Sequence, residues 1–196
     1  MLDRLAPGVT TVAVVSFFVL AMAVPFIAVR ADSTGRALRQ AALVAAVVSY
    51  VAAVMAYTIL PLPDTEEMAR RCATGAGAGA RLIPFGFLAD LDAGAGGLAV
   101  LGQAAWWQVV LNVALFVPFG LALGWVLPVG RVVLLALATA LLIELTQLTG
   151  LWFIYACAYR TFDVDDLWAA VLGALLGWAL SWLAQTGKPP RAAVRN

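Results

Sequence analysis

Five apolar runs in this chain are each about as long as a helix that crosses a lipid bilayer. A hydrocarbon core about 30 Å thick requires roughly 20 residues at a rise of about 1.5 Å per residue. Backbone amides have no water to bond in that core, so each run is expected to be helical. The runs lie at about Val9–Val29, Gln40–Leu60, Trp107–Leu127, Val132–Phe153 and Leu167–Ala184. We therefore expect an all-α fold, a polytopic membrane helix bundle with about five transmembrane helices.

Composition supports a membrane protein and excludes several classes of soluble protein. Hydrophobic residues make up 64% of the chain, whereas soluble domains are only about half apolar. The 12 Lys and Arg residues nearly balance the 11 Asp and Glu residues, so we expect no nucleic-acid partner. His is absent, which removes imidazole catalysis and His-ligated metal. We expect neither a metal nor another cofactor.

The distribution of arginine and lysine predicts the orientation of the helices, because cytoplasmic loops carry an excess of these residues. Basic residues follow the first run, precede the fourth and fill the C-terminal tail: Arg30, Arg36, Arg39, Arg131, Lys188, Arg191 and Arg195. The N-terminus is therefore expected outside the cell and the C-terminus in the cytoplasm. Arg70 and Arg71 oppose this orientation, since they lie on the expected outer side close to the second run.

The long segment 61–106 is expected on the outer side. Between two stretches rich in Gly and Ala it holds the apolar sequence Arg81–Phe87, which is costly to leave in water. This sequence is expected either to dip into the membrane interface or to pack on the helix bundle. Cys72 and Cys157 both fall on the outer side, where oxidation is possible. They form a disulfide or are two unpaired small apolar residues, and the sequence leaves both alternatives open.

Few polar side chains lie inside the apolar runs, and they indicate a site. A charged or amide side chain in hydrocarbon costs a few kcal/mol and normally faces the bundle interior. Glu144 and Gln147 are three residues apart and therefore share one face of a helix. Asn112 lies about 8 Å inside the outer end of the preceding helix. All three are expected in the outer half of the membrane.

The last run begins next to charged residues on the same side. Asp163, Asp165 and Asp166 stand where carboxylates cap the free amide groups of a helix and complement its dipole. Arg160 precedes them and is a candidate partner for Glu144 or Asp166. Further along this run, Gly173 and Gly177 form a G-x-x-x-G motif, which permits close helix approach. We expect this motif to pack inside the bundle rather than to form a dimer, and the oligomeric state stays open.

These polar residues define a candidate ligand-binding site in a pocket that opens outward. Its expected members are Asn112, Glu144, Gln147, Arg160, Asp163 and Asp166. Glu144 and Asp166 are also candidate catalytic residues, because paired carboxyl groups can carry out acid–base chemistry. Whether the chain is an enzyme stays open. In the alternative interpretation, the intramembrane polar groups only hydrogen-bond between helices, and the aspartates only cap a helix.

Four short segments, taken in order along the chain, carry a resemblance to a known family. They are Leu82–Phe85, Asn112–Gly120, Ile143–Gln147 and Arg160–Leu167, the last followed by Gly173 and Gly177. In this order they resemble the VanZ-like family of membrane proteins. The resemblance implies a VanZ-like transmembrane domain at 40–184. Residues 1–39 are then an extra N-terminal transmembrane helix with a cytoplasmic loop, and residues 185–196 are a cytoplasmic tail.

The resemblance implies a role in the cell envelope and in antibiotic resistance. Members of that family are linked to lowered sensitivity to teicoplanin, a lipid-tailed glycopeptide that acts outside the cell. Our first hypothesis is therefore a multi-pass protein of the cell membrane that binds a lipid-linked cell-wall precursor or the lipoglycopeptide, with membrane lipids as partners. The alternatives are an enzyme that modifies a lipid head group and a small transporter. Ala170 stands where the family usually has Asn, and this puts in doubt any activity that needs that amide.

Overall fold

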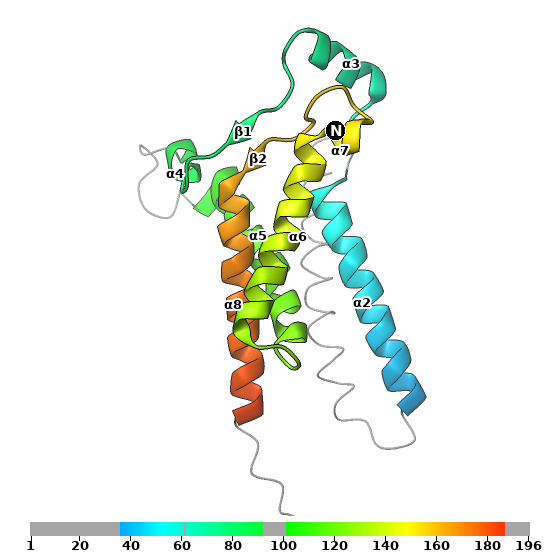
Figure 1. The fold of residues 1–196 in the computed structure, drawn as a ribbon, viewed down its shortest axis with the longest axis vertical. Helices are drawn as coiled ribbons and strands as arrows, with labels where there is room; N and C mark the ends of the chain where they lie inside the picture. The colour runs from blue at the N-terminus through cyan, green and yellow to red at the C-terminus, as the bar shows by residue number, and fades with distance from the viewer. Residues whose placement is uncertain (1–35, 61, 92–100, 187–196) are drawn as a thin grey trace, which may run out of the picture. The chain divides into compact units, whose positions relative to one another are not determined.

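The computed structural model of the chain describes residues 36–60, 62–91 and 101–186 (Figure 1). Most of these residues are helical, and the strands among them are only two residues long. The fold class is all-α, as expected. The chain divides into two compact units, Met1–Asp64 and Thr65–Asn196.

In the first unit, the described part is the helix α2 (Arg36–Thr58). This helix covers nearly all of the second expected run, Gln40–Leu60. The first expected run, Val9–Val29, lies outside the described residues.

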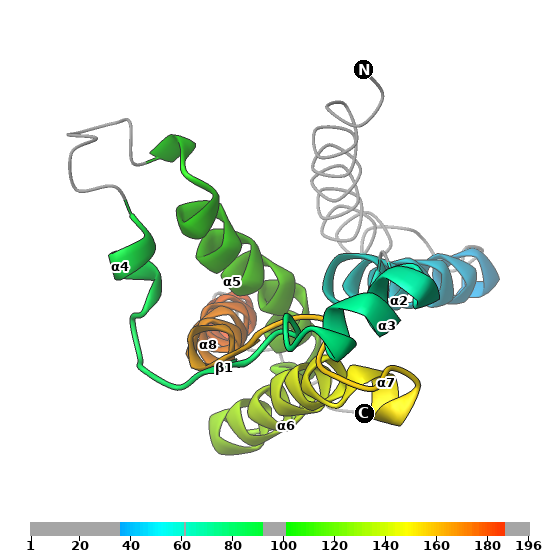
Figure 2. The ribbon, with the colours of Figure 1, turned by 90° about the horizontal axis from the view of Figure 1, so that it is seen from above.

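Three long helices form the body of the second unit: α5 (Ala104–Leu123), α6 (Val129–Leu148) and α8 (Val164–Thr186). Among the described residues, these are the helices that are long and apolar enough to cross a membrane. They confirm the third, fourth and fifth of the expected runs. α8 contacts both α5 and α6, as the view from above shows (Figure 2).

Glycine allows α5 and α8 to approach until their backbones touch. An added Cβ at Gly173 would lie 2.1 Å from the Val113 carbonyl oxygen, and one at Gly177 would lie 2.0 Å from that of Val117. On the opposite helix, a Cβ at Gly120 would lie 2.0 Å from a backbone oxygen of α8. No side chain fits at such distances, so the G-x-x-x-G motif packs inside the bundle, as predicted.

One predicted boundary is wrong. The fourth run was expected to continue to Phe153, but α6 ends at Leu148. The chain then turns through α7 (Gly150–Phe153), where Leu151, Trp152 and Phe153 have φ values of 57°, 56° and 72°. These left-handed conformations cannot continue a right-handed helix. Because the turn is as apolar as the helix before it, hydrophobicity does not mark the boundary.

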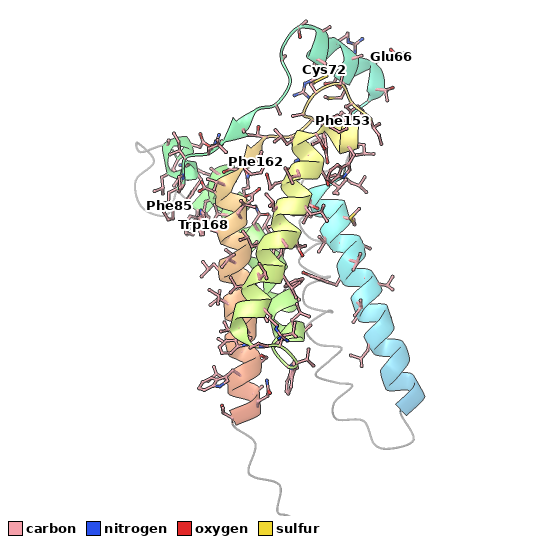
Figure 3. All side chains as sticks on the ribbon, in the orientation of Figure 1. Glu66, Cys72, Phe85, Phe153, Phe162 and Trp168 are labelled. Atoms are coloured by element: carbon pink, nitrogen blue, oxygen red, sulfur yellow. A yellow bond between two sulfur atoms is a disulfide. The ribbon has the colours of Figure 1, made fainter. Side chains whose placement is uncertain are left out.

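A disulfide bond ties the first helix of the second unit to the connection between α6 and α8. It joins Cys72, in α3 (Thr65–Ala73), to Cys157, with the two Cα atoms 5.6 Å apart (Figure 3). The alternative of two unpaired cysteines is thereby settled in favour of the bond. A small apolar core lies beside the disulfide and contains Met68, Tyr155 and Tyr159.

Two short strands bring the segment after α3 to the start of α8. β1 (Ala80–Arg81) pairs in parallel with β2 (Phe162–Asp163), in a register that places Arg81 opposite Asp163. After β1 the chain passes through a short helix, α4 (Phe87–Asp90). The pairing thus brings a basic residue of the long connecting segment beside the aspartates that precede α8.

Candidate functional site

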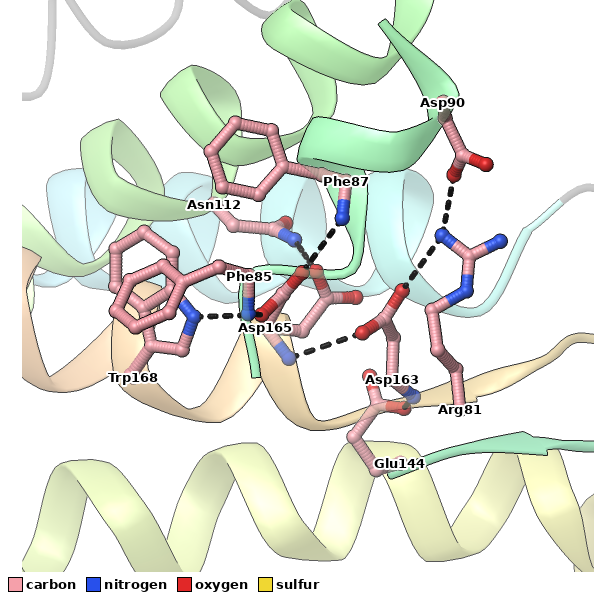
Figure 4. A network of polar contacts seen from close by, with 10 residues as sticks. Arg81, Phe85, Phe87, Asp90, Asn112, Glu144, Asp163, Asp165 and Trp168 are labelled. Atoms are coloured by element: carbon pink, nitrogen blue, oxygen red, sulfur yellow. Dashed lines mark hydrogen bonds and ion pairs between the residues drawn. The ribbon is translucent and has the colours of Figure 1, made fainter. Parts of the chain in front are cut away.

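A cluster of polar side chains lies at the end of the bundle where α5 and α8 begin and α6 ends (Figure 4). By the distribution of basic residues, this is the end predicted to face outward. We call four of these residues the polar cluster: Asn112, Glu144, Asp163 and Asp166. Each comes from a different element, namely α5, α6, β2 and α8 in that order.

Two amide side chains of α5 bind the Asp166 carboxyl group. The Asn112 amide donates a hydrogen bond to Asp166 Oδ1, and Gln108 is hydrogen-bonded to the same carboxyl group. The two amides are four residues apart and therefore lie on one face of the helix. Asn112 is buried and Gln108 is exposed, so the pair of amides runs from the bundle interior toward its end.

Glu144 links α6 to the start of α8. Its side chain is buried, with 2% of the residue surface exposed. Glu144 Oε2 accepts a hydrogen bond of 2.8 Å from the backbone N–H of Asp163. The Glu144 and Asp166 carboxyl groups also lie close enough to interact directly. Such a pair of carboxyl groups can share a hydrogen bond when one of them carries a proton, since an ionised carboxylate can only accept.

Asp163 caps α8 and also faces an arginine. Its Oδ1 accepts a 2.9 Å hydrogen bond from the Asp165 N–H, which confirms the predicted capping role. Its Oδ2 lies 3.7 Å from Arg81 Nη1. Arg81 also forms an ion pair with Asp90. Burial raises the pKa of Asp163, while the hydrogen bond from Asp165 and the charge of Arg81 act in the opposite direction.

Asp165 holds the segment between β1 and α4 against α8. Its carboxylate accepts hydrogen bonds from the backbone N–H groups of Phe85, at 2.6 Å, and Phe87, at 3.0 Å. It accepts a third bond, of 2.8 Å, from Trp168 Nε1. The rings of Phe85 and Phe87 lie 5.3 and 6.3 Å from the Trp168 ring (Figure 4). Packing of Arg81–Phe87 on the bundle, one of the two expected arrangements, is therefore observed, and it leaves the outer face of this segment open to the membrane interface.

The structure brings together four of the six predicted site residues, which are the members of the polar cluster. Gln147 is buried on the same helix as Glu144, and its backbone oxygen accepts a 3.4 Å hydrogen bond from Tyr159. Arg160 is exposed. The arginine that lies beside Asp163 is Arg81, from the other strand. The roles of Gln147 and Arg160 as ligand contacts stay predictions.

Three residues around the polar cluster were missed as site residues. Asp165 was expected only to cap a helix, Arg81 was not considered as a partner of the aspartates, and Gln108 was not considered at all. Gln108 could have been predicted from the sequence, because it lies one helical turn before Asn112 and therefore on the same face of the helix. Within the part of the chain that the structure describes, no group of three or more Cys, Asp or Glu residues is placed to hold a metal ion.

Apolar membrane-spanning helices that enclose a carboxyl and amide cluster define an integral membrane protein with a buried polar site. The model of the VanZ/LLP1 family matches residues 47–185, more than two thirds of the chain. The chain therefore belongs to the VanZ/LLP1 family, as the four short segments indicated. No curated protein and no solved structure matches it.

Proposed function

We propose that this membrane protein binds a lipid-linked molecule of the cell envelope through its polar cluster and so lowers susceptibility to teicoplanin-type lipoglycopeptides. The observation that supports this most is the chain of polar contacts from Asn112 through Asp166 and Glu144 to Asp163. Polar groups at membrane depth are costly and are commonly functional. The ligand is either a lipid-linked cell-wall precursor or the lipoglycopeptide itself.

The hydrogen bonds of the cluster determine how a ligand binds. Among the described residues, every buried side-chain nitrogen and oxygen has a hydrogen-bond partner. A ligand must therefore exchange its own polar groups for an existing bond, such as that between Asn112 and Asp166. Gln147 and Arg160 are the further contacts that we propose for it.

Expression in a teicoplanin-sensitive host tests this proposal. We expect the chain to raise the minimal inhibitory concentration, and Glu144→Ala to abolish the gain. Thr146→Ala is a matched control, because Thr146 is a buried polar residue of the same helix whose hydroxyl bonds only the Leu142 carbonyl. Membrane abundance of each variant is measured in parallel. Unchanged susceptibility with the wild-type chain, or full protection by Glu144→Ala, contradicts the proposal.

A second candidate function is an enzyme that modifies a lipid head group. The specific observation in its favour is the direct proximity of the Glu144 and Asp166 carboxyl groups, since paired carboxyl groups can serve as general acid and base. Mass spectrometry of lipids from cells with the wild-type chain, Asp166→Asn or no protein separates the two functions. An enzyme changes the lipid profile and Asp166→Asn reverses the change, whereas a binding protein leaves the lipids chemically unaltered.

A further inference from the structure

The face of α8 that meets lipid can be followed to the start of the helix. Leu172, Leu176 and Leu180 are exposed and recur every four residues, so they form one stripe along α8. Large apolar side chains exposed on a membrane-spanning helix face lipid. Trp168 precedes Leu172 by four residues and continues the stripe by one turn. It lies about 6 Å from the first residue of α8, where tryptophan commonly marks the membrane interface.

The segment between β1 and α4 is seated on this face. We call residues 82–88 the strap. The rings of Phe85 and Phe87 pack on Trp168, and both backbone N–H groups bond to Asp165. The strap therefore lies on the lipid-facing side of α8, at the depth of the first turns of that helix.

The outer surface of the strap is apolar. Leu82, Ile83 and Leu88 are 67%, 74% and 56% exposed. The two charged residues that flank the strap, Arg81 and Asp90, are paired with each other, and Arg81 also lies beside Asp163. Three large apolar side chains thus project from the strap without a described protein surface to cover them, at a depth where lipid surrounds the helices.

From Pro84 onward, the backbone of the strap also meets the requirement for entering lipid, where every N–H group needs an acceptor within the protein. Pro84 has no N–H group, and those of Phe85 and Phe87 bond to Asp165. The N–H groups of Gly86, Leu88 and Ala89 bond to carbonyl oxygens of Ile83, Phe85 and Gly86. From Pro84 to Ala89, no amide proton needs water as a partner.

We propose that the strap is inserted into the lipid leaflet around the start of α8, where Leu82, Ile83 and Leu88 contact lipid. It is an interfacial element of the protein in addition to the spanning helices. The proposal is independent of the ligand of the polar cluster, because it rests on the outer face of the strap and on its seat on Trp168.

A fluorescent probe on the strap tests the insertion. Cys72 and Cys157 are bonded to each other and are the two cysteines of the chain, so an introduced thiol is labelled selectively. Ile83→Cys carries the environment-sensitive probe NBD in the full chain, reconstituted in phosphatidylcholine nanodiscs. Glu67→Cys is the control, because Glu67 is an exposed charged residue of α3. Leu88→Cys provides a second strap position in case the first variant does not fold.

We expect blue-shifted emission at position 83 and at least twofold quenching by lipids spin-labelled near the top of the acyl chain. The probe at position 67 is instead quenched by aqueous iodide. Iodide quenching at positions 83 and 88 equal to that at position 67 overturns the proposal. Protection of both strap positions from iodide and from spin-labelled lipid also overturns it, since protein rather than lipid then covers the strap.

Discussion

Replacing Asp165 tests whether one carboxylate holds the strap on α8. Asp165 is buried, with 1% of its surface exposed, and accepts hydrogen bonds from Phe85, Phe87 and Trp168. Asp165→Ala leaves three donors without their acceptor, and each unsatisfied donor costs about 1–3 kcal/mol when water cannot replace the partner. The donors are only partly buried, so we take the lower value for each and expect a loss of about 3 kcal/mol.

The assay is thermal unfolding of the purified chain in detergent, followed by tryptophan fluorescence. For a chain of this size, about 1 kcal/mol corresponds to roughly 2–4 °C, so we expect the melting temperature to fall by roughly 6–12 °C. Asp165→Asn keeps one carbonyl acceptor, so its melting temperature is expected to fall by less than that of Asp165→Ala. Asp90→Ala is the control, because it removes an exposed ion pair of the same region, and such pairs contribute about 0–1 kcal/mol. A melting temperature of Asp165→Ala equal to that of Asp90→Ala refutes this reasoning.

Two further predictions concern packing and the disulfide. In Gly177→Ala the added Cβ would lie 2.0 Å from the Val117 carbonyl oxygen, so the two backbones must move apart and the stability is expected to fall by about 1–3 kcal/mol. Leu176→Ala, on the lipid-facing stripe, is the control and is expected to melt within a few degrees of wild type. Equal losses of stability in the two variants contradict the close packing. Cys72→Ala and Cys157→Ala each remove the disulfide bond between two residues separated by 85 positions in the sequence. Each is expected to lower the free energy of unfolding by up to about 4 kcal/mol. Non-reducing melts measure the losses, and clearly unequal losses show that the bond is not their cause.

The long helices could be predicted from the sequence because the thickness of the bilayer determines their length and its apolar core requires apolar residues. α5 and α8 follow the apolar runs, and the start of α8 follows the capping residue Asp163. The end of α6 could not be predicted from hydropathy. Gly150–Phe153 is apolar throughout and differs from the helix only in its backbone angles, which depend on local geometry.

The candidate site was predicted where its signal was a polar side chain inside an apolar run, as for Asn112 and Glu144. The role of Asp165 could not be read in this way, because two of its partners are backbone N–H groups about 80 residues away. Backbone groups are the same in every residue and leave no pattern in the sequence. Arg81 reaches Asp163 through a pairing of two residues per strand, which is too short to recognise in advance.

The close contact of α5 and α8 makes the inner part of this helix pair a permeability barrier. Beyond Asp166, the buried face of α8 continues with Ala170, Gly173 and Ala174, and its backbone touches that of α5. No width is left between these two helices for water or an ion. Passage of a solute between α5 and α8 would therefore require the two backbones to separate.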